Sequence, residues 1–281
     1  MVYDRPYDDR SAGDFLATTD RFDNYGRVVR CSSCGLVFSN PRPHSSEIAK
    51  GYAESEDQEY LQESSNRSIN AHISLATIRR FKPAGKLLEI GSAAGYFLNA
   101  ARTDFEVTGV EPSRWAAAEA KRRFGVEVKV GGFLEAALPD ASFDVVAAVD
   151  VIEHLEDPVA FIRECRRVLK PGGVLYLMTP DIESLSARLL GGSWWGLRPV
   201  HIYYFSRRTL GDLLKREGLE VELVRSFGRI FSLGYWASRL KNYPSYLTRP
   251  ILAVISALGL EDKIFYLNTR DSLELIARRP S

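Results

Sequence analysis

The sequence feature that most restricts the fold is a glycine-containing loop that separates an apolar run from a second run ending in an acid. The segment Leu87-Leu-Glu-Ile-Gly-Ser-Ala-Ala-Gly95 begins as a buried strand would and continues with small residues. Gly91 and Gly95 allow backbone conformations, and an approach to a ligand, that a side chain would block. Glu111 ends the next apolar run, about 20 residues later, where an acid accepts hydrogen bonds from ribose hydroxyls. The loop and the acid together predict a site for an adenosine-type ligand.

This pattern leaves two ligand classes open, a dinucleotide and S-adenosylmethionine, beside a glycine-rich turn that binds nothing. The dinucleotide fingerprint is G-x-G-x-x-G, which Gly91-Ser-Ala-Ala-Gly95 does not meet. Glu89 lies immediately before the loop, where a carboxylate suits a ligand with an ammonium or sulfonium group and repels a pyrophosphate. The position of Glu111 counts against a turn without a ligand.

Apolar runs alternate with helical patterns from residue 66 onward. We expect strands at 86–91, 105–111, 126–130, 143–149, 174–178, 219–224 and 272–277. Helices are expected at 66–81, 95–103, 113–124, 157–169 and 206–217, with Ser113, Asp157 and Ser206 as N-caps. The alternation predicts a parallel sheet covered by helices on both faces. We expect an α/β fold: a Rossmann-like, doubly wound, mostly parallel seven-stranded sheet with an antiparallel last strand. Ligands of such sheets lie beyond the carboxyl ends of the strands.

The bulk composition excludes several classes of protein. The formal net charge of the 281-residue chain is +1, whereas a general nucleic-acid binder carries a clear basic excess, so we expect no nucleic-acid partner. Three cysteines, an odd and small number, argue against a secreted disulfide framework. The N-terminus is polar, unlike a signal peptide, and the longest apolar run, 251–260, is about half as long as a membrane span. We therefore expect a soluble, cytoplasmic protein.

Four segments carry a resemblance to a known family. They are Leu88-Glu-Ile-Gly-Ser-Ala-Ala-Gly95, Thr108-Gly-Val-Glu-Pro-Ser113, Phe143-Asp-Val-Val-Ala-Ala-Val-Asp-Val-Ile-Glu-His-Leu-Glu-Asp-Pro158 and Leu169-Lys-Pro-Gly-Gly-Val174. In order and spacing they resemble the class I S-adenosylmethionine-dependent methyltransferases, and most closely the small-molecule branch that includes the ubiquinone-biosynthesis O-methyltransferases. The resemblance covers residues 86–180 and implies S-adenosylmethionine as the cofactor.

The resemblance also implies roles for individual residues. The positions expected to bind the cofactor are Glu89, Gly91, Ser92, Gly95, Glu111, Pro112, Phe133, Leu134, Asp150, Val151 and Ile152. Among these, Glu111 would hold the ribose hydroxyls, and Phe133 would border the adenine. The chain departs from the family at Ala93, where a glycine is usual, and this matters if the position needs a positive φ.

The expected chemistry is methyl transfer to an acceptor that must lose a proton. A sulfonium is an activated leaving group, so the protein mainly positions the two reactants, and a base assists an alcohol or phenol. Histidine is the usual base near neutral pH. We expect His154, which follows the strand end beside the methyl group, to be the base, with His201 as the second candidate. Asp150 is the alternative if the acceptor is an amine, and positioning without a base is also open.

A second likeness concerns residues 191–218, which resemble the segment that forms part of the substrate pocket in this branch. Its concentrated aromatic residues lead us to expect Trp194, Trp195, Tyr203 and Tyr204 in the wall of an acceptor site, although some such residues are simply core. By analogy with the branch, Tyr52 and Tyr60 would belong to a lid over the cofactor. We divide the chain into an N-terminal extension, 1–65, and a methyltransferase domain, 66–281, with insertions at 181–206 and 226–270.

Cys31 and Cys34 have the spacing of zinc ligands within a segment that resembles half of a zinc ribbon. A structural zinc site needs four ligands, and no second pair of cysteines follows, although His44 could be a third ligand. Cys165 lies on the core-facing side of a predicted helix. We therefore expect no bound metal and a ribbon held together by packing.

The insertion at 226–270 combines arginine and lysine with aromatic and aliphatic residues, which predicts amphipathic helices. A surface of this kind can lie on an anionic membrane or cover a lipid-linked substrate. A substrate lid or a dimer contact is the commoner role, and we expect one of these.

The sequence thus predicts a methyltransferase that uses S-adenosylmethionine and acts on a small-molecule acceptor, at a hydroxyl of a sugar, a glycan precursor or a phenolic compound. The alternatives are a non-catalytic protein that binds S-adenosylmethionine with the same fold and a nicotinamide-dependent oxidoreductase, against which the missing third glycine counts. The accepting atom and the oligomeric state stay open, because a fold does not specify them.

Overall fold

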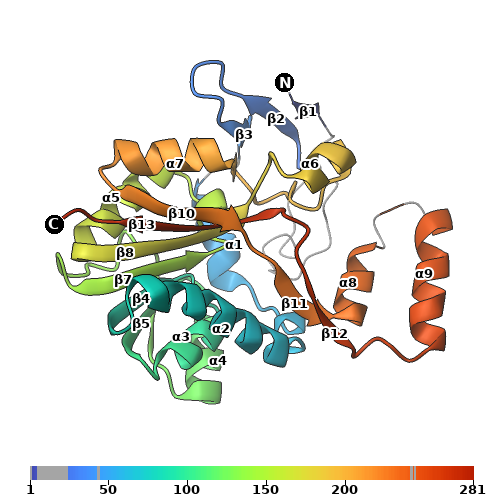
Figure 1. Cartoon of the computed structure of the whole chain (residues 1–281), viewed down its shortest axis with the longest axis horizontal. Coiled ribbons are helices and arrows are strands. Elements are labelled where there is room, and N and C mark those ends of the chain that lie inside the picture. The colour runs from blue at the N-terminus through green and yellow to red at the C-terminus, as the bar shows by residue number, and fades with distance from the viewer. Residues whose placement is uncertain (1, 5–24, 43–44, 241–242, 244) are drawn as a thin grey trace.

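Seven strands form the central sheet of the computed structural model, which describes residues 2–4, 25–42, 45–240, 243 and 245–281 (Figure 1). The strand order is β10-β13-β8-β7-β4-β5-β6, and only β13 runs antiparallel to its neighbours. Their bounds are β4 Gly85–Ile90, β5 Phe105–Glu111, β6 Val128–Val130, β7 Phe143–Val149, β8 Leu169–Pro180, β10 Glu220–Ser226 and β13 Ser272–Arg278. The predicted doubly wound sheet with an antiparallel last strand is confirmed.

The helices begin at the predicted caps. Ser113 Oγ accepts a hydrogen bond from the Ala116 amide, and Asp157 accepts two from the first turn of its helix. The bounds of the helices are α1 Ser45–Glu54, α2 Ser64–Phe81, α3 Tyr96–Ala101, α4 Arg114–Phe124, α5 Pro158–Val168, α6 Leu185–Leu190, α7 Arg207–Arg216, α8 Leu233–Arg239 and α9 Ser245–Ala257. Short 3₁₀ turns lie at η2 Glu59–Leu61, η3 Ile152–His154 and η4 Gly191–Ser193.

Two predicted strands have different lengths in the structure. Strand β6 begins at Val128 instead of Val126, whereas β8 extends from Leu169 to Pro180 instead of covering 174–178. Strand β8 has a partner on each side, β7 and β13, so its hydrogen-bonded ladder continues beyond the apolar run from which it was predicted.

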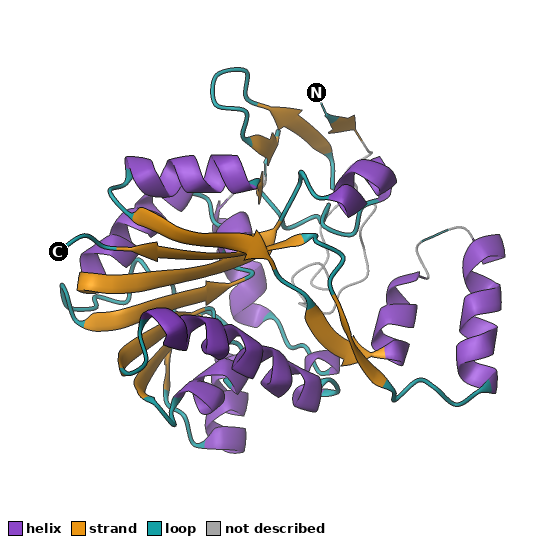
Figure 2. Ribbon diagram, in the orientation of Figure 1, coloured by secondary structure: helices purple, strands orange, loops and turns teal. Residues whose placement is uncertain are grey.

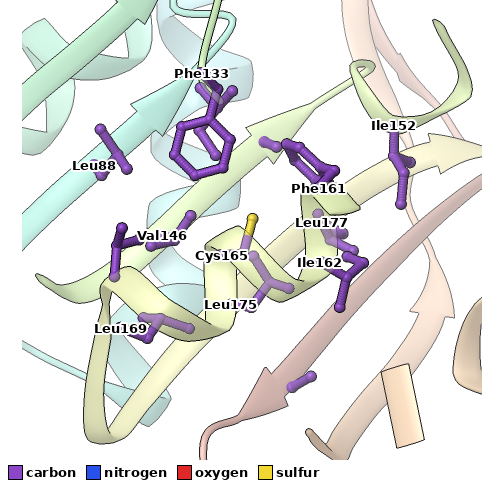
Figure 3. Packing of buried hydrophobic residues seen from close by; sticks show 14 of the residues in the cluster. Leu88, Phe133, Val146, Ile152, Phe161, Ile162, Cys165, Leu169, Leu175 and Leu177 are labelled. Carbon is purple, nitrogen blue, oxygen red and sulfur yellow. The ribbon is translucent and has the colours of Figure 1, made fainter. Parts of the chain in front are cut away.

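Helices cover both faces of the sheet (Figure 2). Alternating side chains of the parallel strands pack into two layers, one on each face. Leu88, Val146 and Leu175 contribute to the layer shared with α5 and α7. Leu87, Val145 and Tyr176 contribute to the layer shared with α2 and α3. Figure 3 shows the first layer, where Cys165 packs among aliphatic and aromatic side chains, as its predicted core position requires.

The N-terminal extension joins a second, smaller sheet. Its strands are β1 Tyr3–Asp4, β2 Arg27–Arg30, β3 Val37–Ser39 and β9 Tyr203–Tyr204, paired in that order. Because β9 belongs to the 181–206 insertion, the extension and the insertion form one unit in the part of the chain that the structure describes. Cys31 and Cys34 lie in the turn between β2 and β3, which the Gly35 amide closes by donating to the Cys31 carbonyl at 2.9 Å. His44 lies outside the described residues.

The 226–270 insertion begins and ends in a two-stranded ribbon, β11 Arg229–Ser232 and β12 Ile264–Leu267. At its far end α8 and α9 stand beside the main body, on the right in Figure 1. Helices were predicted here, whereas the ribbon was not. No helix within the described ranges is long and apolar enough to cross a membrane.

A buried polar group inside the sheet gives the first testable prediction. Glu274 on β13 is fully buried and accepts hydrogen bonds from the Tyr176 hydroxyl, at 3.0 Å, and from the Arg225 guanidinium. Glu274→Ala leaves the buried hydroxyl without this acceptor, so we expect the free energy of unfolding in urea to fall by about 1–3 kcal/mol.

The matched control is Glu222→Ala, which removes a partly exposed ion pair with Arg278 between β10 and β13. It should cost no more than about 1 kcal/mol. Equal losses of unfolding free energy in the two variants would contradict the claim that burial makes the Glu274 hydrogen bonds more important than the exposed ion pair.

Candidate functional site

The loop after β4 turns back toward β5 immediately beyond the strand end. The amides of Gly91 and Ser92 both donate to the Val110 carbonyl, at 2.8 and 3.3 Å. Gly91 has a φ of +71°, and a Cβ at this position would lie 2.7 Å from Val151 Cγ2. The position therefore requires glycine both for its backbone conformation and for its contact with the loop after β7.

Glu111 holds this loop from the end of β5. Its Oε2 accepts the Ala93 amide and its Oε1 accepts the Ser113 amide, each at 2.9 Å. Burial raises the pKa of Glu111, and these two hydrogen bonds oppose the rise. One carboxylate thus joins the glycine loop to the start of α4, while its remaining lone pairs can still accept hydrogen bonds from a ligand.

Ala93 has a φ of +44°, so the position at which the chain departs from its resemblance does need a positive φ. An L-residue with a side chain is strained in this region, and glycine is not. The Glu111 hydrogen bond to the Ala93 amide helps to hold the backbone there.

Glu89 lies on β4 directly beneath the loop and is buried. Its Oε2 and the neighbouring Ser92 Oγ have no hydrogen-bond partner among the described residues. Burial raises the pKa of Glu89 well above its usual value, and the nearby Glu111 adds to the rise. A buried carboxyl in this state fits a cationic donor, such as an ammonium group, because the donor satisfies the oxygen and favours its charged form.

Most of the residues predicted to bind the cofactor line one cavity of about 950 Å³ at the carboxyl ends of the strands. The residues that line it are Glu89, Gly91, Ser92, Glu111, Pro112, Phe133, Leu134, Asp150 and Val151. Gly95 and Ile152 lie outside the lining. Gly95 has a φ of +79° before α3 and packs against Ala120, and Ile152 is in the core.

Asp150 is paired with an arginine that the sequence analysis did not single out as a site residue. Arg229, the first residue of β11, donates from Nη2 to both carboxylate oxygens at 2.7 Å. The charge of Asp150 raises the pKa of Arg229 further, against the effect of burial. The expected alternative base is therefore held in an ion pair. Because the partners are 79 positions apart, neighbouring sequence gives no signal of the contact.

The two candidate bases lie together. The rings of His154 and His201 meet edge to face, with their centroids 4.6 Å apart. Burial and the Arg198 guanidinium lower the pKa of His154 to about 4, and burial lowers that of His201 well below its usual value. Both imidazoles are therefore neutral at neutral pH. His201 Nδ1 lies 2.8 Å from the Gly196 carbonyl, which can only accept, so this tautomer leaves Nε2 as an acceptor.

Beside the histidines, Glu153 is buried and its Oε1 has no hydrogen-bond partner among the described residues. Thr179 donates to its other oxygen at 3.0 Å. One ligand atom from each of Glu153, His154 and His201 lies within 4.8 Å of the others, which is the donor set of a carboxylate–histidine metal site. The Arg198 cation nearby opposes a metal ion there. Cys31 and Cys34 do not belong to this group.

Tyr52 and Tyr60, the expected lid residues, both line the cavity. The Tyr52 hydroxyl lies 2.7 Å from His154 Nδ1, and burial raises the pKa of that hydroxyl, so it stays protonated. Ser113 Oγ donates to the Ser55 carbonyl at 2.9 Å. This hydrogen bond attaches the residue after α1 to the start of α4. The segment from α1 to η2 thus borders both the cofactor residues and the histidines.

The four expected aromatic substrate residues separate in the structure. Trp195 lines the cavity and donates from its indole to Asp271 at 2.6 Å. Trp194 and Tyr204 are buried in the core beneath the small sheet, where they pack with Val37. The Tyr203 hydroxyl donates to the Glu156 carbonyl, and its ring packs on the main core. These last three do not line the cavity. For Tyr203 and Tyr204, the pairing of β9 with β3 fixes this position.

The cavity has instead an aromatic wall from the 226–270 insertion, formed by Phe231, Tyr235 and Trp236. Phe231 and Tyr235 are stacked with ring centroids 4.1 Å apart, and Trp236 meets Phe231 edge to face. The spacing of aromatic and basic residues in this segment was a signal for an amphipathic cover, but it did not indicate which face would turn inward.

Comparisons with known proteins agree with this geometry. Residues 58–224, more than half of the chain, match the family model described as a methyltransferase domain. A protein of Mycolicibacterium smegmatis described as a probable S-adenosylmethionine-dependent methyltransferase is 37% identical over 138 residues, which are 48% of this chain and 52% of that protein. A ubiquinone biosynthesis O-methyltransferase of Cereibacter sphaeroides is 29% identical over 165 residues, 54% of this chain and 66% of its own length.

The chain thus spans about half of the length of its mycobacterial relative. Among solved structures, a methyltransferase of Archaeoglobus fulgidus superposes with a TM-score of 0.55 and 20% identity, covering 79% of this chain and all of that one. That likeness shows the fold.

The strained loop residue gives a prediction for the site. Ala93→Gly removes the cost of a positive φ, so we expect the free energy of unfolding to rise by about 1 kcal/mol in urea titrations.

Its control is Ala94→Gly. Ala94 is the next residue, is fully buried and has an ordinary φ. That change should destabilise the protein by about 1 kcal/mol, since glycine only adds freedom to the unfolded chain and removes a buried methyl group. A loss of stability in Ala93→Gly as well would refute the assigned strain.

Proposed function

Because this chain belongs to the S-adenosylmethionine-dependent methyltransferases, we propose that it transfers a methyl group to a small-molecule acceptor at a hydroxyl of a sugar, a glycan precursor or a phenolic compound. The observation that carries the proposal is the pair of buried carboxyls around the glycine loop. Glu89 offers an oxygen without a partner among the described residues, and Glu111 presents a fixed carboxylate at the end of β5.

The residues present fit S-adenosylmethionine. Glu89 and Ser92 would hold its ammonium and carboxylate end, Glu111 its ribose hydroxyls, and Phe133 would border the adenine. When bound, the cofactor supplies a methyl group on a sulfonium. Glu89 is suited to a cation, because it is buried without a positive partner of its own among the described residues.

We assign His154 as the base that takes the acceptor's proton. Its pKa of about 4 keeps the imidazole neutral. In the tautomer that this role requires, Nδ1–H donates toward the Val200 carbonyl at 3.2 Å and the Tyr52 hydroxyl oxygen at 2.7 Å, so Nε2 is left to accept the proton. His201 packs against its edge and supports it from the buried side. Asp150 is engaged by Arg229 and serves as a positioning group in this account. A positioned base contributes about 10²–10⁴-fold to the rate.

The reacting end of the acceptor is enclosed, because residues from several parts of the chain border the cavity there. The lid tyrosine Tyr52, the insertion residue Phe231 and Trp195 all contribute to its lining. Exclusion of water by such a lining strengthens the electrostatic contacts within it. The ubiquinone O-methyltransferase relative supports oxygen as the accepting atom.

The proposal is tested by measuring S-adenosylhomocysteine release from a panel of catechols, sugars and glycosides, with His154→Gln beside the wild type. We expect kcat of the variant to fall by about 10²–10⁴-fold while S-adenosylmethionine binding is kept. The matched control is His72→Gln, which changes an exposed histidine on α2 and should leave kcat unchanged.

The dependence of kcat on pH gives a second test of the role of His154. Because the pKa of His154 is lowered, its base form persists as the pH falls, and the rate limited by it should decline only near pH 4. An unchanged kcat in His154→Gln would refute the base role of His154, and positioning of the two reactants would be the remaining source of catalysis. Cofactor binding by the wild type without turnover of any acceptor would favour a non-catalytic binding protein.

A further inference from the structure

We propose that residues 226–270 build a second compartment of the cavity, and that this compartment holds an apolar chain carried by the methyl acceptor. The inference rests on the proposed function and specifies its acceptor as an amphiphile. The matched family region ends at residue 224, so this compartment is formed by a part of the chain that lies beyond it.

The compartment is fixed to the cofactor side of the molecule by its first strand. Arg229 is paired with Asp150, and the next residue, Ile230, forms two hydrogen bonds with the Asn70 side chain on α2, at 2.7 and 2.8 Å. Ser232 then donates to Glu63 at 2.6 Å. The ribbon is therefore held at three successive points, and its inner face has a defined position beside the cofactor residues.

The lining of this compartment is apolar. The segment contributes Phe227 and Arg229 at the cofactor end, followed by apolar and aromatic residues that include Phe231, Leu233, Trp236, Ile251 and Ile255. After Arg229, no described lining residue of the segment carries a charge. One of the few polar groups is already engaged, since the Tyr243 hydroxyl donates to the Ser193 carbonyl at 3.1 Å.

Charge and apolar surface are thus largely separated within one cavity. Most of its charged groups, among them Glu89, Glu111 and Arg198, lie around the glycine loop and the histidines. Two charged groups lie at the border of the apolar compartment, Arg67, whose guanidinium is 5.8 Å from the centroid of the Phe231 ring, and Asp271, which accepts the Trp195 indole N–H. A ligand that fills both regions needs a polar reacting group at one end and an apolar portion at the other. A sugar alone would leave its hydroxyls against aliphatic and aromatic walls, which is unfavourable without hydrogen-bond partners.

The apolar compartment is open at its outer end. Ile251 on α9 and Leu190 on α6 line the cavity and yet are 49% and 37% exposed. A chain longer than the compartment can therefore leave between these helices. The volume of about 950 Å³ lies near the upper end of the range of about 300–1,000 Å³ for small-molecule sites, which suits two ligands side by side.

The test uses cis-parinaric acid, a fluorescent long-chain polyene acid, titrated into the full chain saturated with S-adenosylhomocysteine. Sorbic acid, a short conjugated acid, is the competitor that controls for recognition of the carboxylate. We expect a saturable rise in cis-parinaric acid fluorescence on binding. A long saturated fatty acid should displace the probe and reverse the rise, whereas sorbic acid should not.

Ile255→Glu places a charge in the apolar wall and should weaken binding at least about tenfold. The matched control is Val254→Glu on the same helix, which changes an exposed residue outside the lining and should bind as the wild type does. Ala237→Phe fills the compartment without a charge and should also weaken binding, which covers the case in which Ile255→Glu fails to fold.

Calorimetry with S-adenosylhomocysteine separates this inference from the proposed function. Binding of S-adenosylhomocysteine without saturable cis-parinaric acid binding would overturn the inference and leave the proposed function intact. Equal affinities in Ala237→Phe, Val254→Glu and the wild type would also overturn it. Failure of the wild type to bind S-adenosylhomocysteine would instead overturn the proposed function.

Discussion

The rest of the site depends on the two hydrogen bonds that the Glu111 carboxylate accepts from backbone amides. This carboxylate accepts amide hydrogens from Ala93 and Ser113, so one buried side chain fixes both the glycine loop and the start of α4. The cost of burying this carboxyl is offset by hydrogen bonds that only the folded loop provides. The strained Ala93 backbone and the crowded Gly91 are held by the same arrangement. The glycine loop and the start of α4 are thus held by contacts within the protein itself.

In the proposed account, the two segments that were predicted as insertions form the acceptor side around this core. The 181–206 segment supplies Arg198 and His201 and is attached to the N-terminal extension through β9. The 226–270 segment supplies the apolar wall and is attached at Asp150, Asn70 and Glu63. Both attachments reach the edge of the sheet where the histidines lie. The sheet therefore determines where the methyl group would be, and the insertions determine what would meet it.

The sequence predicted well those features that depend on residues close together along the chain. Apolar periodicity and the caps Ser113 and Asp157 predicted the strands and these helix starts, because both depend on neighbouring residues. Most positions that the resemblance assigns to the cofactor line one cavity, since strand ends meet at one edge of a parallel sheet. The Arg229–Asp150 pair could not be predicted, because nothing local joins positions so far apart. Trp194 and Tyr204 were expected in the acceptor wall from the likeness of their segment and its concentration of aromatic residues, whereas both lie in a core cluster beneath the small sheet. For Tyr204 this follows from the pairing of β9 with β3, which joins residues far apart in the sequence.

The most direct test of the central claim is a calorimetric titration of Glu111→Gln with S-adenosylmethionine. A glutamine has one accepting oxygen, so it can hold only one of the two amides, and its NH₂ group faces the other donor. The control is Glu106→Gln, an exposed position on the same strand. The account predicts that Glu111→Gln weakens binding at least about tenfold while Glu106→Gln binds as the wild type does. Wild-type affinity in Glu111→Gln would contradict it.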